Sequence, residues 1–594
     1  MKTNKFSQTL ILILLLITLN SISCCKGTAP DITPEAPANS PTPVFNSLSI
    51  QTDKAVYKPG DDVTFTMDIS ALPAGAKVRY KYLNTVVSEA VVNTPSWKWG
   101  TPSDDFRGYT AEVYATANTV ETIYAVSGVD VSSVWTKFPR YGFISKYPIL
   151  GQTYVDSVIT NLNRLHINGL QFYDWQNKHH IPLPVVGTTP LTSWKDIGGR
   201  DNYLASIQQY ISSAHGRGMK AMFYDLVYGA WENAEADGVD VKWYIYNDPT
   251  HTNRDFFALS SPFLSNLYLL DPANSGWQNY MINQVNIVYK YLAFDGYHMD
   301  QVGDRGTRYR YDGTNALLSN AFKPFIDAIK TAAPTKFNVL NAVAQYGQQG
   351  IATSSSDFLY TEVWSPSDSY NDLANIIKQN NTLCNNSKNT VLAAYMNYDM
   401  ASTPGYFNTP SVLTTDAVIF AFGGSHIEMG EHMLCREYFP NSSLTIKDDL
   451  KKSLINYYDF SVAYENLLRD GGTFNSVTLS SIDSKIAIST WPSSLGKVAV
   501  FGKKVDTRQV IHLINFSNAT TLKWRDNSGI QVMPALVKDA KVVLTSDATV
   551  KKIWIASPDV NGGASRSLNY TQLANKVSFI LPELRYWDMV VVEY

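Results

Sequence analysis

Apolar and polar positions follow three successive patterns along this chain of 594 residues. From residue 45 to residue 133 they alternate in short stretches such as "VTFTMDIS" and "YTAEVYA", separated by turn sequences such as "KPGDD". Alternation with a period of two is typical of strands that bury one face. We therefore expect an immunoglobulin-like β-sandwich over residues 45–133.

The pattern changes over residues 134–470, where apolar strand-like runs alternate with amphipathic helical stretches. The eight runs cover residues 141–147, 167–175, 220–228, 294–300, 337–343, 357–364, 390–398 and 417–430. Eight alternations of strand and helix predict a (β/α)8 TIM barrel. A doubly wound open sheet is the alternative, but it usually has a glycine-rich phosphate turn after its first strand, and none follows residue 147.

Residues 471–594 return to strand-like runs such as "KVAVFGK", "VIHLINF" and "MVVVEY". Several short strands at regular spacing predict a second, C-terminal Greek-key β-sandwich. The fold class predicted for the whole chain is therefore multidomain, with one α/β barrel between two β-domains.

The first 24 residues read as a lipoprotein-type signal peptide. Two lysines precede the apolar run "TLILILLLITL", which is too short to span a bilayer comfortably and ends at "NSISCC". We expect lipidation of Cys24, with Cys25 as the competing site and plain secretion as the alternative. Residues 25–44 are rich in proline and predict an extended tether that holds the folded part clear of a membrane.

The signal predicts an exported protein, anchored in a bacterial outer membrane or cell surface, with a periplasmic or secreted form as the alternative. The two remaining cysteines, Cys384 and Cys435, are free to pair in an oxidising compartment. Net charge is −3 and the isoelectric point is near 6.3, which argues against a nucleic-acid partner. No metal-binding pattern is present, and "DQVGD" lacks the spacing of a calcium loop. We expect no metal, no cofactor and a monomer.

Polar residues recur where the predicted barrel strands end, which is where barrels place their functional groups. They are Asp174, Asp225, Asp300, Asn341, Glu362, Asn397, His426 and Glu428. Aromatic residues, which make up 12% of the chain, accompany them. Aromatic faces stack on sugar rings, although core packing explains the same composition. Carboxylates and aromatics at one barrel mouth suggest a glycoside hydrolase, whose chemistry needs two carboxyl groups.

Strand polarity separates the three acids of "FDGYHMDQVGDRG", residues 294–306. Asp295 lies at the start of the strand, so we expect it to form a salt bridge at the far end of the barrel. Asp300 ends the strand and projects into the mouth, whereas Asp304 lies in the following glycine-containing loop. Glu362 ends another strand among aromatic residues, a setting that raises a carboxyl pKa and suits a general acid.

Several long motifs in this order resemble glycoside hydrolase family 66, the bacterial endo-dextranases and cycloisomaltooligosaccharide glucanotransferases. They include "LQFYDWQNKHHIPLP", "FDGYHMDQVGD", "YTEVW", "GGSHIEMGEHMLCREYFPN" and "LPELRYWDMVVVEY". The resemblance implies the same three domains and a retaining mechanism on α-1,6-linked glucan, with dextran and isomaltooligosaccharides as partners. It also implies that Asp300 is the nucleophile and Glu362 the acid/base.

The other strand-end residues become candidates for binding sugar units. They are Tyr173, Asp174, Trp175, His179, Tyr224, Asp225, His298, Asn341, Trp364, Asn397, His426 and Glu428. A structural role is the alternative for His179 and for about half of the aromatics.

Two rival functions stay open. The resemblance implies that the family's transferases carry an additional carbohydrate-binding module in the catalytic region. The longest interval between strands here, residues 229–293, resembles a lid instead, so hydrolysis is favoured. A non-catalytic, glycan-binding surface lipoprotein would fit the tether and the aromatics, but it would not need both Asp300 and Glu362.

Overall fold

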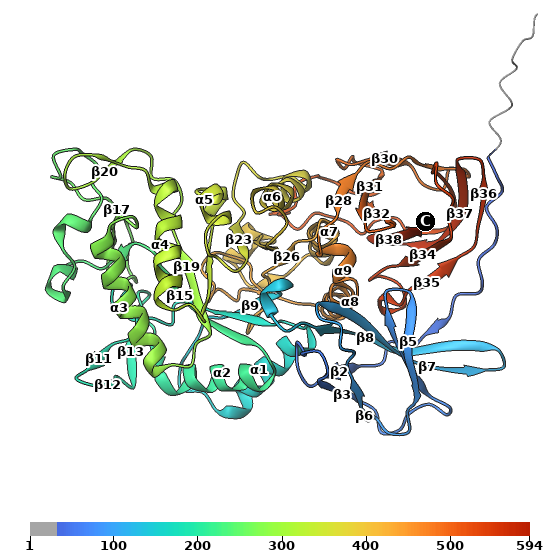
Figure 1. Ribbon diagram of the computed structural model, residues 1–594, viewed down its shortest axis with the longest axis horizontal. Helices are drawn as coiled ribbons and strands as arrows, with labels where there is room; N and C mark the ends of the chain where they lie inside the picture. The colour runs from blue at the N-terminus through green and yellow to red at the C-terminus, as the bar shows by residue number, and fades with distance from the viewer. Residues whose placement is uncertain (1–32) are drawn as a thin grey trace, which may run out of the picture.

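The computed structural model describes residues 33–594, in which strands predominate and three regions are visible (Figure 1). The predicted signal peptide, with Cys24, lies outside the described residues. Within residues 33–594, every helix is too short or too polar to cross a bilayer.

The N-terminal region consists of two β-sheets around one core. The five-stranded sheet has the order β1-β8-β7-β4-β5, and the three-stranded sheet has the order β2-β3-β6. These strands are β1 (Val44–Phe45), β2 (Ile50–Thr52), β3 (Asp62–Met67), β4 (Lys77–Tyr82), β5 (Thr85–Val91), β6 (Ser96–Gly100), β7 (Arg107–Ala117) and β8 (Val120–Val131). Alternate residues of β3 are buried, as the sequence pattern predicts. Aromatic side chains of both sheets meet in the core, where the rings of Tyr80 and Trp99 stack with centroids 4.2 Å apart.

Two sheets of the central region together contain eight parallel strands. The first sheet has the order β22-β19-β15-β10-β9, and the second has the order β23-β24-β26. These strands are β9 (Tyr141–Ile144), β10 (Gly169–Phe172), β15 (Lys220–Leu226), β19 (Gly296–Asp300), β22 (Phe337–Leu340), β23 (Leu359–Glu362), β24 (Thr390–Ala393) and β26 (Ser425–His426). Each predicted run contains one of them, and the observed strands are shorter than the runs.

Helices lie between these strands along the chain, and two more follow the last strand. They are α1 (Gln152–Arg164), α2 (Leu204–Gly216), α3 (Ser275–Tyr291), α4 (Leu318–Ala332), α5 (Gln348–Ala352), α6 (Tyr370–Leu383), α7 (Thr409–Ala421), α8 (Asp448–Ala463) and α9 (Glu465–Leu468). The eighth predicted strand was wrong over residues 417–421, which end α7. That helix is buried on all sides from Ser411 onward, so its sequence lacks the polar face that identifies a surface helix.

The C-terminal region again consists of two sheets around one core. Its larger sheet has the order β28-β31-β32-β38-β34-β35, with β30 beside β31, and its smaller sheet has the order β29-β33-β37-β36. The strands are β28 (Thr473–Asn475), β29 (Leu479–Ser481), β30 (Ile488–Thr490), β31 (Val498–Val505), β32 (Arg508–Asn515), β33 (Val537–Thr545), β34 (Lys552–Ala556), β35 (Arg566–Leu568), β36 (Tyr570–Leu573), β37 (Lys576–Leu584) and β38 (Trp587–Glu593). Every strand-like run predicted here overlaps an observed strand.

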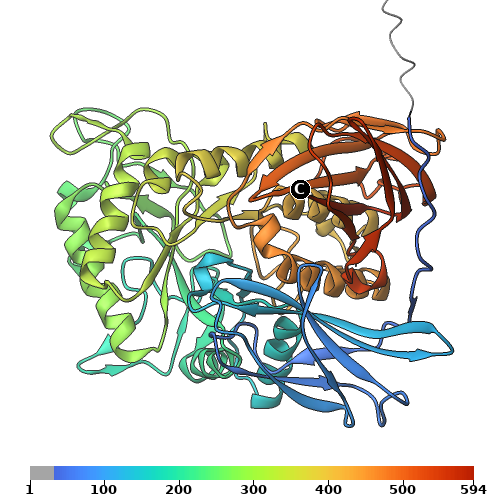
Figure 2. The same ribbon diagram turned by 45° about the vertical axis from the view of Figure 1, so that its right-hand side comes forward.

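Helix α8 joins the central region to the N-terminal sheet, which lies beneath it in Figure 2. The Asp459 carboxylate accepts hydrogen bonds from the Gly128 backbone nitrogen at 2.8 Å and from Ser127 Oγ at 3.1 Å. A Cβ at Gly128 would lie 2.6 Å from the Asp459 carbonyl oxygen, so only glycine permits this approach. The helix and strand are therefore in direct backbone contact.

Residues 33–43 form no helix or strand and run along the C-terminal region (Figure 1). Asn39 Nδ2 donates to the Ile580 carbonyl oxygen at 2.9 Å, and Asn569 Nδ2 donates to the Ala38 carbonyl oxygen at 2.7 Å. This part of the predicted tether is thus extended but held against the folded chain. Residues 25–32 lie outside the described part.

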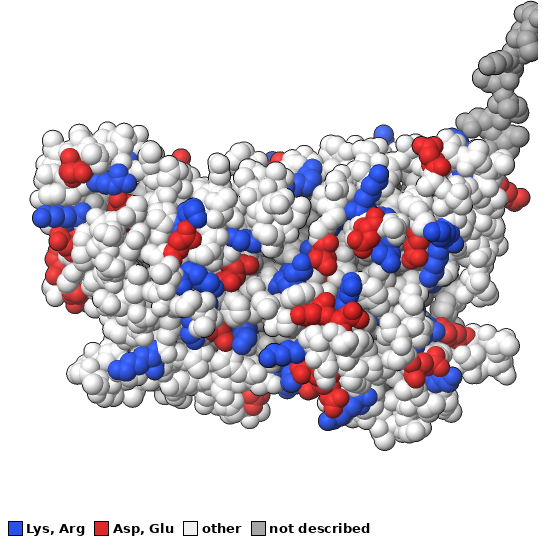
Figure 3. Space-filling view, in the orientation of Figure 1, with Lys and Arg blue, Asp and Glu red and all other residues white. Residues whose placement is uncertain are grey.

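Cys384 and Cys435 are both buried free thiols, so the pairing that the sequence left open is not formed. On the face shown in Figure 3, acidic and basic side chains lie among one another, without an extended area of one sign.

Candidate active site

A cavity of 460 Å³ opens where β10, β15, β19, β22 and β23 end. We call it the central cavity. Nine of the predicted site residues line it, namely Tyr173, Asp174, His179, Tyr224, His298, Asp300, Asn341, Glu362 and Trp364. Parallel strands bring their carboxyl ends to one edge, which explains why residues far apart in the sequence meet here.

Asp300, the last residue of β19, is held from two neighbouring strands. Tyr224 of β15 donates its hydroxyl to Asp300 Oδ2 at 2.8 Å, and the Gln301 backbone nitrogen donates to Oδ1 at 2.8 Å. Asn341 Nδ2, just beyond β22, also donates to Oδ1 at 2.9 Å. Burial raises the pKa of Asp300, while these three donors favour its ionised form and counteract that shift.

Glu362 ends β23 and has its own set of partners. The Tyr395 hydroxyl donates to Glu362 Oε1 at 2.7 Å, and Asn341 Nδ2 donates to Oε2 at 3.1 Å. Burial, followed by the negative charge of Asp300, raises the pKa of Glu362 to about 7. A carboxyl group with this pKa holds its proton in mildly acidic water and releases it near neutrality, as a group that alternates between acid and base must.

The amide of Asn341 connects the two carboxyl groups. The same nitrogen lies 2.9 Å from Asp300 Oδ1 and 3.1 Å from Glu362 Oε2, so these two oxygens are at most 6.0 Å apart, the sum of the two distances. Asn341 Oδ1 in turn accepts from the Glu362 backbone nitrogen at 3.1 Å. One side chain therefore fixes the spacing of two acids with shifted pKa values.

Asp174 occupies another part of the cavity wall and carries its own counter-ion. Its backbone is in the left-handed region, with φ 48°, directly after the end of β10. Arg200 Nη2 lies 3.5 Å from Asp174 Oδ2 and 2.6 Å from Asp196 Oδ2. Burial raises the pKa of Asp174 to about 7, and Arg200 opposes that rise. Arg200 and Asp196 were missed because neither lies at the end of one of the eight predicted strand runs.

The two histidines of the cavity are neutral. Burial lowers the pKa of both His179 and His298 to about 3. His298 lies between rings, 5.7 Å from Tyr141 and 4.8 Å from Tyr360 by ring centroids. His179 accepts from Trp231 Nε1 at 3.3 Å. Both rings are therefore neutral hydrogen-bonding groups rather than cations.

Three predicted sugar-binding residues lie outside the cavity, and for them the prediction is corrected. Asp225 follows Tyr224 on β15, and since strand side chains alternate it is buried on the opposite face. Trp175 is buried and donates its Nε1 to the Tyr224 carbonyl oxygen at 3.0 Å. Asn397 donates its Nδ2 to the carbonyl oxygen of Asp526 in the C-terminal region at 2.8 Å.

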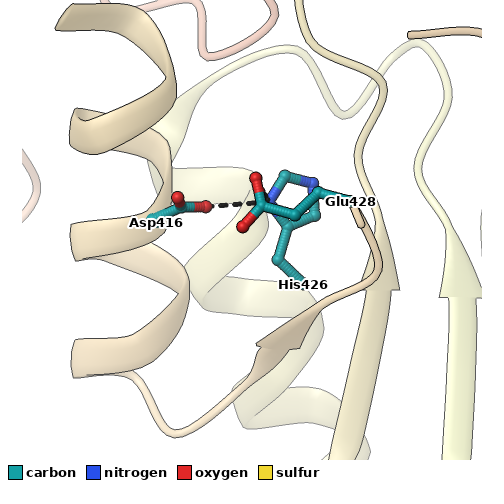
Figure 4. A group of neighbouring side chains, drawn as sticks. All are labelled: Asp416, His426 and Glu428. Carbon is teal, nitrogen blue, oxygen red and sulfur yellow. Dashed lines mark hydrogen bonds and ion pairs between the residues drawn. The ribbon is translucent and has the colours of Figure 1, made fainter. Parts of the chain in front are cut away.

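His426 and Glu428 are also buried away from the cavity, where they meet Asp416 of α7 (Figure 4). His426 Nε2 donates to the Ala394 carbonyl oxygen at 2.8 Å, and a second hydrogen bond of 2.8 Å joins Nδ1 to Asp416 Oδ1. One possible ligand atom from each of the three side chains lies within 4.8 Å of the others, so this group could hold a metal ion. The His426 ring thus connects Asp416 of α7 to Ala394, the residue before Tyr395, whose hydroxyl binds Glu362.

The other two acids of the "FDGYHMDQVGDRG" stretch occupy their predicted places. Asp295 accepts from the Ala221 backbone nitrogen at 2.9 Å and pairs with His215 at 2.7 Å and Lys220 at 3.1 Å. Asp304 is exposed and accepts from the Gly306 backbone nitrogen at 2.8 Å. Asp300 is thus the acid of this stretch that lines the cavity.

Two parts of the cavity wall contain residues that sequence reasoning did not name. The interval 229–293 contributes Phe257, Leu259, Phe263 and Leu267, in agreement with its interpretation as a lid. The motif "REYFPN" contributes Glu437, Tyr438 and Phe439, and the Phe439 ring stacks on Tyr173 with centroids 4.4 Å apart. These aromatic residues do not lie at the end of a predicted strand, so strand polarity did not select them.

The sequence profile of glycosyl hydrolase family 66 matches residues 52–591. The chain belongs to this family. Membership confirms the resemblance found in the motifs.

The curated relatives of this chain include both glucanotransferases and a dextranase. A cycloisomaltooligosaccharide glucanotransferase of Niallia circulans is 28% identical over 741 aligned positions, covering 98% of this chain and 75% of that protein. A dextranase of Streptococcus salivarius is 23% identical over 603 positions, covering 88% of this chain and 70% of that protein.

A solved family 66 structure has the same fold. The cycloisomaltooligosaccharide glucanotransferase of Paenibacillus sp., in complex with cycloisomaltoheptaose, superposes with a TM-score of 0.85 and 25% identity, covering 92% of this chain and all of that one.

Proposed function

We propose that this protein is a retaining endo-dextranase that hydrolyses α-1,6-glucosidic linkages in dextran and releases isomaltooligosaccharides. Asp300 is the nucleophile and Glu362 the acid/base. The observation that carries the proposal is the pair of carboxyl groups held by Asn341, whose facing oxygens are at most 6.0 Å apart. Retaining glycosidases have carboxyl groups about 5–5.5 Å apart, whereas inverting enzymes need about 6.5–9.5 Å to admit a water molecule.

The reaction follows from the positions of the two acids. Asp300 attacks the anomeric carbon while Glu362 protonates the departing O6, so that the glycosidic bond breaks as an ester bond to Asp300 forms. Glu362, now ionised, takes a proton from water, and the resulting hydroxide attacks the anomeric carbon and releases Asp300. Two inversions restore the α configuration.

The pKa of Glu362 is suited to both steps. In the free enzyme, the charge of Asp300 contributes to raising that pKa to about 7, which keeps Glu362 protonated in mildly acidic solution. Once Asp300 is esterified its charge is gone, so the pKa of Glu362 falls and the carboxylate becomes available as a base.

We also propose that the eight parallel strands close into a (β/α)8 barrel between an immunoglobulin-like and a Greek-key domain. Two contacts support closure between the parallel sheets. The Ala342 backbone nitrogen donates to the Tyr360 carbonyl oxygen at 2.9 Å, and the Phe143 nitrogen donates to the Met429 carbonyl oxygen at 3.1 Å. The first joins the end of β22 to β23, and the second joins β9 to the residues beyond β26.

The test measures reducing sugar released from linear dextran by wild type, Asp300→Asn and Glu362→Gln. Each substitution should lower kcat by at least about 10³-fold, since it removes the nucleophile or the general acid. Asp304→Asn is the matched control, because this exposed carboxylate lies four residues from Asp300 and outside the cavity. Loss of release only in the first two variants supports the proposal. Wild type that binds dextran without cleaving it refutes it in favour of glycan capture.

A glucanotransferase is the second candidate, because curated relatives at 28% identity carry that name. Hydrolysis is favoured by length: one transferase alignment spans 741 positions against a chain of 594, so at least 147 positions of that relative have no counterpart here. Mass spectrometry of the products distinguishes the two, because cyclic products lack the water that linear ones gain.

We propose that the chain is exported, lipidated at Cys24 and active as a monomer. The support is the signal-like sequence that ends at "NSISCC". Labelling of cells with a palmitate analogue should mark the protein, and Cys24→Ala should abolish the label. Persistent labelling of that variant would assign the lipid to Cys25.

A further inference from the structure

A second cavity lies beside the central one, where the central and C-terminal regions meet. It has a volume of 480 Å³ and is lined by Trp364, Asp368, Tyr398 and Asp399 of the central region and by residues between 521 and 530 of the C-terminal region. We call it the junction groove. Trp364 lines both spaces, so the groove continues directly from the central cavity.

The two spaces are also linked by a hydrogen bond. Tyr398, in the junction groove, donates its hydroxyl to Oε1 of Glu437, which lines the central cavity, at 2.7 Å. Trp364 is two residues from Glu362, so the groove begins beside the proposed acid/base. In the proposed mechanism, that residue protonates the leaving group. The groove therefore lies on the leaving-group side of the scissile bond.

The wall from the C-terminal region is firmly positioned. Asn397 Nδ2 holds the Asp526 carbonyl oxygen at 2.8 Å, and Asn408 Nδ2 holds the Gly529 carbonyl oxygen at 2.8 Å. Trp524 Nε1 donates to the Ser367 carbonyl oxygen at 2.7 Å. A wall fixed by hydrogen bonds to loops and a helix cap of the central region can bind a flexible chain without first being ordered.

Aromatic and cationic groups form the floor. The Arg525 guanidinium lies 4.9 Å from the Trp364 ring centroid and 5.2 Å from that of Tyr398. Its Nη2 donates to the Val363 carbonyl oxygen at 2.8 Å, which fixes the cation. The Arg436 guanidinium also lies 4.8 Å from the Tyr398 centroid, so cations hold both rings in fixed positions within the groove.

Hydrogen-bonding groups at the rim are unoccupied. Among residues 33–594, the side chains of Asp399, Lys523 and Asn527 are exposed and form no hydrogen bond or ion pair. Together they offer an anionic acceptor, a cationic donor and an amide that does both. Such groups above an aromatic floor suit a neutral polyhydroxylated chain.

We propose that the junction groove binds the glucosyl units of an α-1,6-glucan that follow the leaving-group unit, so that the C-terminal region forms part of the substrate site. This inference rests on the proposed function, because an endo-acting enzyme must accommodate the polymer on both sides of the bond it cleaves. Substrates whose leaving group ends inside the central cavity do not reach the groove.

The experiment compares the double variant Lys523→Ala/Asn527→Ala with Lys504→Ala/Asn575→Ala, a matched pair of exposed residues outside the groove. Two substrates are used: long linear dextran, and an aryl isomaltotrioside whose aryl leaving group stops short of the groove. We expect KM for dextran to rise about tenfold in the groove variant, corresponding to the loss of about 1.4 kcal/mol of binding. Its kcat, and both constants on the aryl substrate, should stay within about twofold.

An unchanged KM for dextran, or an equal loss on both substrates, would overturn the inference while leaving dextran hydrolysis by wild type intact. Affinity electrophoresis in dextran-containing gels, with Glu362→Gln as background, gives a readout that does not need turnover. If wild type does not cleave dextran, the proposed function fails. A weaker retardation of the groove variant than of the control would still support binding in the groove, and equal retardation would refute it.

Discussion

The hydroxyl of Tyr395 sets the pH at which Glu362 releases its proton. It donates to Glu362 Oε1 at 2.7 Å, and this bond favours the ionised carboxylate and lowers its pKa. Tyr395→Phe removes that donor and leaves the ring. We therefore expect the pKa of Glu362 to rise above its value of about 7. Since the first step of the proposed mechanism needs protonated Glu362, the alkaline limb of the activity profile should move to higher pH.

The size of the shift follows from the strength of the bond. A hydrogen bond to a charged group contributes about 1.5–3 kcal/mol, and one pKa unit corresponds to about 1.4 kcal/mol. Part of the lost bond is replaced by water entering the space of the hydroxyl. We expect a shift of about one unit, from pH 7 to pH 8, with kcat/KM at pH 5.5 changed by less than about threefold.

The assay is the dependence of kcat/KM on pH between 4.5 and 9.5, with reducing sugar released from dextran as the readout. Tyr360→Phe is the control, because Tyr360 lines the same cavity and its hydroxyl donates no hydrogen bond to Glu362 among the described contacts. Its alkaline limb should stay near pH 7. A limb that stays fixed in Tyr395→Phe, or moves to lower pH, would refute the assignment of that limb to Glu362 and of the hydroxyl as its donor.

Three further outcomes are expected. Burial raises the pKa of Glu428 to about 8, so wild type should lose stability between pH 4.5 and pH 8, and Glu428→Gln should become relatively more stable over that interval, by up to about 5 kcal/mol in thermal or urea unfolding. A difference independent of pH would contradict this. Arg200→Met removes the cation beside Asp174, so the pKa of Asp174 should rise above about 7, Asp174 should be protonated at neutral pH, and KM for dextran should rise about tenfold. Arg200→Lys keeps the charge and should be less affected, and equal effects of the two variants would contradict a role for charge. Alkylation of unfolded, unreduced protein should modify both Cys384 and Cys435, whereas a disulfide would protect them.

The sequence predicted the two acids because their strands are regular to the last residue. Asp300 and Glu362 are the final residues of β19 and β23, so alternation and strand polarity applied directly to them. The same reasoning failed at Asn397, since β24 ends at Ala393 and the following residues turn away, with φ 53° at Asn397. An apolar run does not reveal where its strand stops.

The hydrophobic pattern of the sequence also does not predict contacts between segments that are distant in the chain. His426 follows a two-residue strand and turns toward Asp416 of α7, a contact that depends on how helix and sheet pack. Asp225 was chosen for its position near a strand end, although its neighbour Tyr224 occupies the cavity side. Arg200 reaches Asp174 from a loop, and loop positions carry no periodicity from which to place them.

The bonds that fix the 521–530 loop bear on how the chain divides into exchangeable parts. Arg525 holds the carbonyl oxygen of Val363, the residue after Glu362, and Trp524 holds that of Ser367. Removing the C-terminal sheets would therefore release the segment that carries Glu362, the proposed acid/base. A chimera between family members would have to transfer this loop together with the strands it supports. The domain boundary expected from the sequence, at residue 470, separates the loop from the strands that it holds in place.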